Sequence, residues 1–131
     1  MSNNYPEDLR YTEQHEWVRV EGKSAFVGIT DFAQHELGDI VYVELPSVNQ
    51  NIEVSEKICT VESVKTVSDV YSPVSGKIIT INADLEDNPD IINEDPYGDG
   101  WMVEIEISNT EEIQGLMTAA EYKNFVEEAA S

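Results

Sequence analysis

The chain has 131 residues, of which 27 are acidic and 7 are Lys or Arg, so its formal net charge at pH 7 is −20. A surface this acidic repels the phosphates of nucleic acids and of anionic membranes, and neither is expected as a partner. The hydrophobic content of 40% suits one folded domain, and Cys59, the single cysteine, excludes an internal disulfide.

The N-terminal part of the chain divides into a tail and a hairpin. Residues 1–8 are polar and are predicted to form a flexible tail ahead of a single domain that spans residues 9–131. Apolar residues alternate over 15–20 around Trp17, a break containing glycine follows, and the apolar pattern resumes over 24–29. This pattern predicts a β-hairpin.

A short helix and a strand are predicted next. Thr30 can cap a helix over residues 31–37, which Gly38 would end. The side chains expected to face inward from this helix are Phe32, Ala33 and Leu37. Alternation over residues 39–45 predicts a half-buried strand that Pro46 stops.

A weak internal repeat spans the middle of the chain. Residues 38–43 resemble residues 76–81, and a strand over 56–62 has its counterpart in 100–107. Two similar halves joined at Lys65 predict a pseudo-twofold β-structure in which each half covers the apolar face of the other.

The remaining C-terminal segments are predicted to be structural. Residues 84–98 are rich in Asn, Asp, Pro and Gly and are predicted to be mostly loop; they are acidic but lack the spacing of an EF-hand. Thr110 and Thr118 can each cap a helix. Thr118 and Glu121 have the spacing of a capping box, which predicts a C-terminal helix over about 118–128.

The feature around which the chain is organised is a lone lysine, Lys65, between two arms rich in β-branched residues. The tetrapeptide Ser63-Val64-Lys65-Thr66 fits a type I turn, so Lys65 is predicted at the tip of a hairpin with its amine in solvent. Such an amine is well placed for acylation by another enzyme. From composition alone, an ordinary solvated turn lysine is the commoner interpretation.

Several blocks of sequence, taken together, resemble the glycine cleavage system H protein family over about residues 9–125. They are Tyr11-Thr12, His15-Glu16-Trp17-Val18, Val27-Gly28-Ile29-Thr30-Asp31, Leu37-Gly38-Asp39-Ile40-Val41, Val61-Glu62-Ser63-Val64-Lys65-Thr66 and Gly100-Trp101-Met102. The resemblance implies a mainly β fold, a barrel-sandwich hybrid with a few short peripheral helices and a C-terminal helix. It also implies covalent lipoate on Lys65.

The resemblance further implies a carrier rather than an enzyme. A lipoyl arm would take the aminomethyl group of glycine from a pyridoxal-phosphate glycine decarboxylase (P protein) to a folate-dependent aminomethyltransferase (T protein). A dihydrolipoyl dehydrogenase (L protein) would reoxidise the arm. A lipoate ligase or a lipoyl/octanoyl transferase would attach it, and the arm would supply the chemistry.

Four further residues receive predicted roles. Glu62 and Ser63 flank the lysine and are expected to help the attaching enzyme recognise the hairpin. Glu16 and Asp69 match family motif positions at a groove that would shelter the loaded arm from water. His35 stands one place before the position at which some members have a histidine, so a surface role is expected for it.

Other interpretations stay open. A donor of lipoyl groups to 2-oxoacid dehydrogenases would need the same Lys65. An unmodified interaction module would need no modified lysine. A biotin carrier is disfavoured because Val64 and Thr66, rather than methionines, flank the lysine. The two histidines and Cys59 show no metal-ligand spacing.

A monomer is expected because a carrier must show its arm to several enzymes in turn. A cytoplasmic location is expected because no stretch approaches the length that crosses a bilayer and the first nine residues lack the apolar run of a secretory signal. A mature organellar form would look the same.

Overall fold

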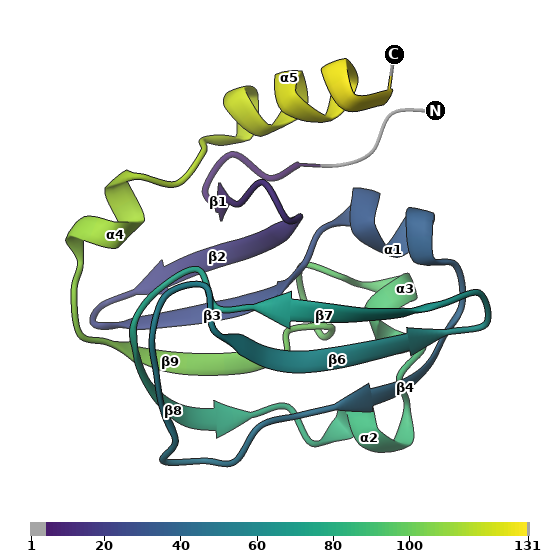
Figure 1. Ribbon diagram of the computed structural model, residues 1–131, viewed down its shortest axis with the longest axis horizontal. Helices are drawn as coiled ribbons and strands as arrows, with labels where there is room; N and C mark the ends of the chain where they lie inside the picture. Colours follow the sequence, from purple (N-terminus) through teal and green to yellow (C-terminus); the bar gives the residue numbers. More distant parts are fainter. Residues whose placement is uncertain (1–4, 131) are drawn as a thin grey trace.

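Two antiparallel sheets enclose the core in the computed structural model, which describes residues 5–130 (Figure 1). The larger sheet has the order β1 (Arg10–Tyr11), β2 (Glu16–Glu21), β3 (Ser24–Ile29), β9 (Val103–Ile107), β8 (Gly76–Ile81) and β5 (Asn51–Ile52). The smaller sheet has the order β4 (Ile40–Glu44), β6 (Lys57–Ser63) and β7 (Val67–Tyr71). A mainly β fold with peripheral helices is therefore confirmed.

The N-terminal hairpin predicted from the sequence is confirmed as β2 and β3, paired from Glu16↔Ile29 to Glu21↔Ser24. Trp17 is fully buried, and its indole N–H donates to the carbonyl oxygen of Pro96 at 2.8 Å. Gly28 lies directly opposite Trp17, and a Cβ there would stand 2.8 Å from the indole ring. Only glycine therefore leaves room for this ring.

The predicted short helix is also confirmed, as α1 (Asp31–Leu37). Thr30 Oγ1 accepts from the Ala33 N–H at 3.2 Å, and Gly38 ends the helix with φ of +84°. The three residues expected to face inward are half-buried. The most buried residue of the helix is Gln34, whose side-chain oxygen accepts from the Asn93 amide at 2.9 Å.

The simple alternation predicted for residues 39–45 is wrong. Ile40 and Val43 are buried, whereas Val41 and Tyr42 between them are both exposed. The pairing of β4 with β6 shifts between Ile40 and Tyr42. A bulge of this kind adds one residue to one strand and so changes which side chains face the core.

The two halves of the internal repeat form equivalent strand pairs, and the twofold relation between them stays a prediction. Strand β4 pairs with β6 in the smaller sheet, and the counterpart strands β8 and β9 pair in the larger one. Side chains from both sheets meet in one core cluster, which includes Val43, Val61, Ile78 and Ile105. Cys59 is buried in the same cluster, as expected for a small residue of a packed strand.

The prediction of mostly loop over residues 84–98 is wrong. Two single-turn helices, α2 (Asp84–Asp87) and α3 (Ile91–Glu94), occupy about half of this segment. Each carries one fully buried apolar side chain, Leu85 and Ile92 respectively. Burial of these anchors therefore outweighs the loop-forming composition around them.

The C-terminal segment contains α4 (Glu111–Gln114) and α5 (Ala119–Ala130). Thr110 precedes α4 without a side-chain capping bond, contrary to expectation. The capping box before α5 is confirmed: the Glu121 N–H donates to Thr118 Oγ1 at 3.3 Å, and the Thr118 N–H donates to Glu121 Oε1 at 2.8 Å.

Residues 1–4 of the predicted tail lie outside the described residues. From Tyr5 onward the chain packs, because the Tyr5 ring meets Tyr122 edge-on at 5.1 Å between centroids. The second core cluster, which includes Tyr11 and Tyr122, lies between α5 and the β1–β2 edge. Among the described residues no helix combines the length and the apolar character that spanning a bilayer needs.

Candidate functional site

The hairpin of β6 and β7 turns at residues 63–66, as predicted. The Ser63 N–H donates to the Thr66 carbonyl oxygen at 2.8 Å. Ser63 Oγ accepts from the backbone N–H groups of Lys65 and Thr66, each at 3.1 Å. Ser63 is almost fully buried, and the two hydrogen bonds that its hydroxyl accepts stabilise the conformation of the turn.

Lys65 stands exposed at the tip of this turn. Its Nζ lies 3.4 Å from the carbonyl oxygen of Glu36, in the last turn of α1. A Cβ on Gly38 would come within 3.0 Å of Lys65 Cε, so glycine leaves room for the lysine chain. The Val64 N–H donates to the Asp39 carbonyl at 3.0 Å and ties the tip to the segment after α1. The amine is therefore exposed but held beside a helix end.

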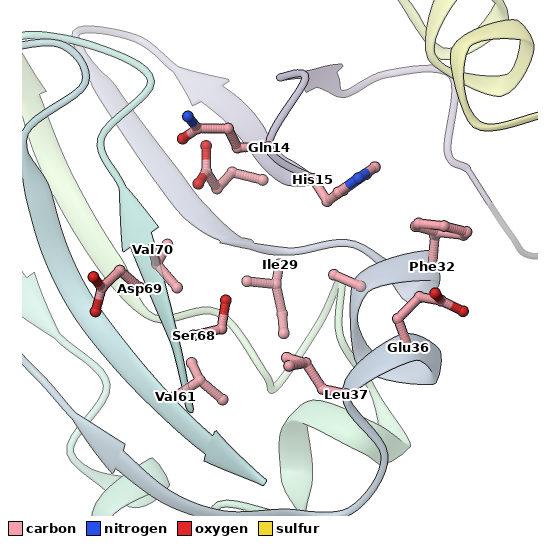
Figure 2. A pocket seen from close by; sticks show the side chains of 12 residues that line it. Gln14, His15, Ile29, Phe32, Glu36, Leu37, Val61, Ser68, Asp69 and Val70 are labelled. Atoms are coloured by element: carbon pink, nitrogen blue, oxygen red, sulfur yellow. The ribbon is translucent and has the colours of Figure 1, made fainter. Parts of the chain in front are cut away.

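A groove of about 260 Å³ lies beside this contact: its lining includes Glu36, whose carbonyl oxygen meets Lys65 Nζ (Figure 2). Its apolar lining is Ile29, Phe32, Ala33, Leu37, Val61 and Val70. Its polar lining is Gln14, His15, Glu16, Glu36, Ser68 and Asp69. A long aliphatic chain with a polar end would match this mixture of surfaces.

Glu16 lines the groove as predicted, but its carboxylate is already engaged. The Thr12 hydroxyl donates to Oε1 at 2.7 Å, and the Tyr71 N–H donates to Oε2 at 3.0 Å. Burial raises the pKa of this carboxyl above its usual value, opposed by the hydrogen bonds from Tyr71 and Thr12. Glu16 therefore ties β2 to the end of β7 across the two sheets.

Asp69 contributes to the groove wall, but its carboxylate faces the other side of the sheet. Figure 2 shows its side chain directed away from the cavity. There Asp69 Oδ1 accepts from the Thr60 hydroxyl at 3.3 Å. Ser68, paired with Val61, lines the groove instead because neighbouring residues of a strand alternate between faces. A role for Asp69 toward the arm stays a prediction.

The other three predicted residues lie at three different places. Glu62 is exposed on the outer face of the smaller sheet, between Tyr42 and Val67 in the cross-strand pairing. Ser63 lies beneath the turn, so any recognition by an attaching enzyme would read the conformation that it holds. His35 is exposed on α1, as expected for a surface role.

Four polar groove residues were missed by sequence reasoning: Gln14, His15, Glu36 and Ser68. His15 packs against aromatic rings, and it also lines the groove. Burial lowers the pKa of its imidazole, and the carboxylate of Glu36 partly opposes this shift. The only available signal was that His15 precedes Glu16 directly. Among the described residues, no cluster of three or more His, Cys, Asp or Glu could hold a metal ion.

Two facing antiparallel sheets, with an exposed lysine at a hairpin tip of the smaller one, are typical of the barrel-sandwich class of carrier domain. The model of the glycine cleavage H-protein family matches residues 9–129. The chain belongs to this family.

Relatives agree over nearly the whole chain. A glycine cleavage system H protein of Halalkalibacterium halodurans is 52% identical over 126 residues, covering 96% of this chain and 98% of the relative. One from an Anaeromyxobacter species is 55% identical and covers 94% of this chain and 96% of the relative. The crystal structure of a glycine cleavage system H protein from Mycobacterium marinum superposes with a TM-score of 0.86 at 38% identity, covering 93% and 98% of the two chains.

Proposed function

We propose that this chain is the lipoyl carrier of the glycine cleavage system, with lipoate attached to Lys65. The observation that carries the proposal is an exposed amine at the tip of a fixed turn, beside a groove lined by both apolar and polar side chains. An acyl chain on Nζ would start at the mouth of this groove. The residues present therefore fit a lipoyl group.

The chain's own residues present and shelter the arm. Ser63 fixes the turn, so that the acyl acceptor is held at one place for the attaching enzyme. When bound, the lipoyl group would supply the sulfur chemistry that carries an aminomethyl group. The apolar side chains of the groove exclude water from a chain that folds back into it, and the polar ones offer hydrogen bonds to its amine end.

Within this proposal Glu16 supplies a negative charge at the groove wall, and Glu62 supplies one beside the lysine. Support for Glu16 comes from its place in the groove and from the two hydrogen bonds that fix its carboxylate. Support for Glu62 comes from its exposure next to the turn. Asp69 would need a side chain turned toward the groove to act on the arm directly.

The partners proposed are the other members of glycine cleavage: the pyridoxal-phosphate decarboxylase, the folate-dependent aminomethyltransferase and the dihydrolipoyl dehydrogenase. A lipoate ligase or lipoyl/octanoyl transferase is proposed to load Lys65. With a net charge of −20, the carrier favours encounter with basic surfaces on these enzymes. We propose that it works as a monomer in the cytoplasm, where the arm stays accessible to each enzyme in turn.

Peptide mapping and intact mass of the protein from its native host, grown on glycine, test the proposal. We expect the mass of one lipoyl group, located on Lys65. Lys57 and Lys77, which lie in strands β6 and β8, serve as internal controls and should stay unmodified. An unmodified Lys65 under these conditions, or lipoate on either control lysine, would contradict the proposal.

A further inference from the structure

His15 adopts a backbone conformation that non-glycine residues seldom take. Its φ is +72°, in the left-handed region. Its carbonyl oxygen accepts from the Thr30 N–H at 3.0 Å, and its own N–H donates to the Thr12 carbonyl oxygen at 3.1 Å. The backbone is thus held from both sides in a costly conformation, at a residue that lines the groove. Such outliers persist where the surrounding structure determines them.

The imidazole of His15 is held by the C-terminal helix. Its Nδ1 lies 2.7 Å from the Tyr122 hydroxyl, which comes from α5, 107 residues later in the chain. The same hydroxyl lies 2.8 Å from Thr30 Oγ1, the group that caps α1. One tyrosine oxygen therefore joins the groove histidine to the first turn of the helix that forms the opposite wall.

Packing fixes the same two rings. The His15 ring lies 4.8 Å from the Phe32 ring and 5.9 Å from the Phe125 ring, centroid to centroid. Tyr122 is fully buried and stacks on Tyr11 at 4.7 Å with an interplanar angle of 8°. The position of the Tyr122 hydroxyl is thus set by ring packing and not by the hydrogen bond alone.

The hydrogen bond decides which nitrogen of His15 is left for a ligand. Among the described residues no buried side-chain nitrogen or oxygen lacks a partner, and none of these residues is a hydrogen-bond partner of Nε2, so this atom is open to solvent. Because burial lowers the pKa of the imidazole, the neutral form is favoured, and its two nitrogens then differ in role. Figure 2 shows the His15 side chain extending from the residue before β2 toward the side of α1 on which Phe32 lies.

We propose that Tyr122 is a positioning residue of the carrier: its hydroxyl accepts from Nδ1–H of His15 and donates to Thr30 Oγ1, which orients the imidazole in the groove wall and leaves the Nε2 lone pair to accept from the amine end of the loaded arm. The C-terminal helix is then part of the arm's shelter. This inference rests on the proposed function, because the ligand is the aminomethyl group that the arm would carry.

The test uses Tyr122→Phe, which removes the hydroxyl and keeps the ring. Tyr11→Phe is the matched control: it alters the other ring of the same stack, whose hydroxyl donates to the Pro6 carbonyl oxygen at 2.6 Å and not to the groove. Two quantities are measured for the parent and both variants. The first is the His15 tautomer in unmodified protein, from long-range ¹H–¹⁵N correlation spectra. The second is the lifetime of the aminomethyl group on lipoylated, loaded protein without aminomethyltransferase.

We expect the parent and Tyr11→Phe to show one dominant tautomer and the same lifetime. In Tyr122→Phe both ring nitrogens should show averaged shifts, and loss of formaldehyde and ammonia should be roughly three- to tenfold faster, the factor for one lost hydrogen bond. Lipoylation of Lys65 should be unchanged in all three proteins.

Each other outcome has a defined meaning. A mixture of tautomers in the parent overturns the inference before any variant is made. So does a Tyr122→Phe protein that keeps its cargo as long as the parent does, or a Tyr11→Phe protein that loses it equally fast, since either would make the role of Tyr122 merely structural. If the lipoylated parent itself accepts no aminomethyl group, the proposed function fails and the inference fails with it.

Discussion

The hairpin tip and the groove adjoin each other, yet they are constructed in opposite ways. The tip is local: four consecutive residues close it, and its side chains at Val64, Lys65 and Val67 stand in solvent, with Val64 67% exposed. The groove is assembled from the start of β2, from α1 and from β6 and β7. Its polar side chains at Glu16 and His15 are hydrogen-bonded to residues on other elements.

The difference shows how the molecule divides its tasks. In the proposed function a partner enzyme must reach the lysine, which agrees with a tip that is open and on which few contacts depend. The groove must hold its shape without a partner, so its side chains also carry part of the tertiary structure. Changes at the tip should therefore affect chemistry alone, whereas changes in the groove should affect both stability and retention of the cargo.

The largest expected effect is the complete loss of carriage in Lys65→Arg. The charge is kept and the exposed tip should tolerate the change, but a guanidinium is not an acyl acceptor for the attaching enzyme. Glycine–bicarbonate exchange with the purified enzymes measures the loss. Lys57→Arg, on the exposed side of β6, is the control and should be fully active. Measurable exchange by the Lys65→Arg protein would contradict the assignment of the chemistry to the lysine at the exposed tip.

The next largest effect is on stability, in Glu16→Ala. Removal of this carboxylate leaves the Tyr71 N–H and the Thr12 hydroxyl without their acceptor, which should cost about 2–4 kcal/mol. Glu16→Gln can keep only one of the two contacts, because Thr12 Oγ1 already accepts from the Gln14 and Glu16 N–H groups and has no lone pair left for an amide donor; it should cost about 1–2 kcal/mol, less than Glu16→Ala. Urea unfolding gives both values. Glu62→Ala, at the exposed end of β6, should leave the unfolding free energy almost unchanged. Equal losses of stability in Glu16→Ala and Glu62→Ala would refute the claim that groove residues stabilise the fold and residues near the tip do not.

A third prediction separates the two acidic residues assigned to the groove. Glu16→Gln should shorten the lifetime of the loaded aminomethyl group. The expected loss of stabilisation is about 1–3 kcal/mol, the scale of a charge-assisted hydrogen bond. Asp69→Asn should change it little, because the Asp69 carboxylate points to the outer face. A single-turnover chase without aminomethyltransferase measures both. A larger effect at Asp69 would mean that its side chain turns inward when the arm is loaded.

The smallest effect is a gradual dependence on pH. Because burial raises the pKa of Glu16 in the folded protein, the folded state binds its proton more tightly than the unfolded state, whose value is near 4.5. The contribution of Glu16 to stability is therefore fully present below this pH and is lost as pH rises through the folded pKa. The difference in unfolding free energy between the parent and Glu16→Gln, in which other carboxylates cancel, should move against the parent from pH 4 to pH 7. If this difference in unfolding free energy does not change with pH, the Glu16 carboxyl binds its proton equally well in both states, as an exposed carboxyl would.

Local features were read correctly from the sequence because neighbours in the chain decide them. The turn at Lys65, the helix between Thr30 and Gly38 and the capping box at Thr118 each depend on residues within a few positions of one another. The internal repeat was also readable, since pairing within each half repeats the same pattern. The glycine cleavage family followed from motifs of the same local kind.

Only the tertiary structure decided which groups meet in the groove. Asp69 and Ser68 differ by one position, and the register of β7 against β6 alone turns Ser68 toward the groove and Asp69 away from it. The bulge that exposes Val41 leaves no trace in an alternating pattern. The bond from His15 to Tyr122 joins residues whose separation in sequence carries no periodic signal. Side-chain direction in a sheet reverses with every residue, so the identity of a groove residue depends on register, which long-range packing sets.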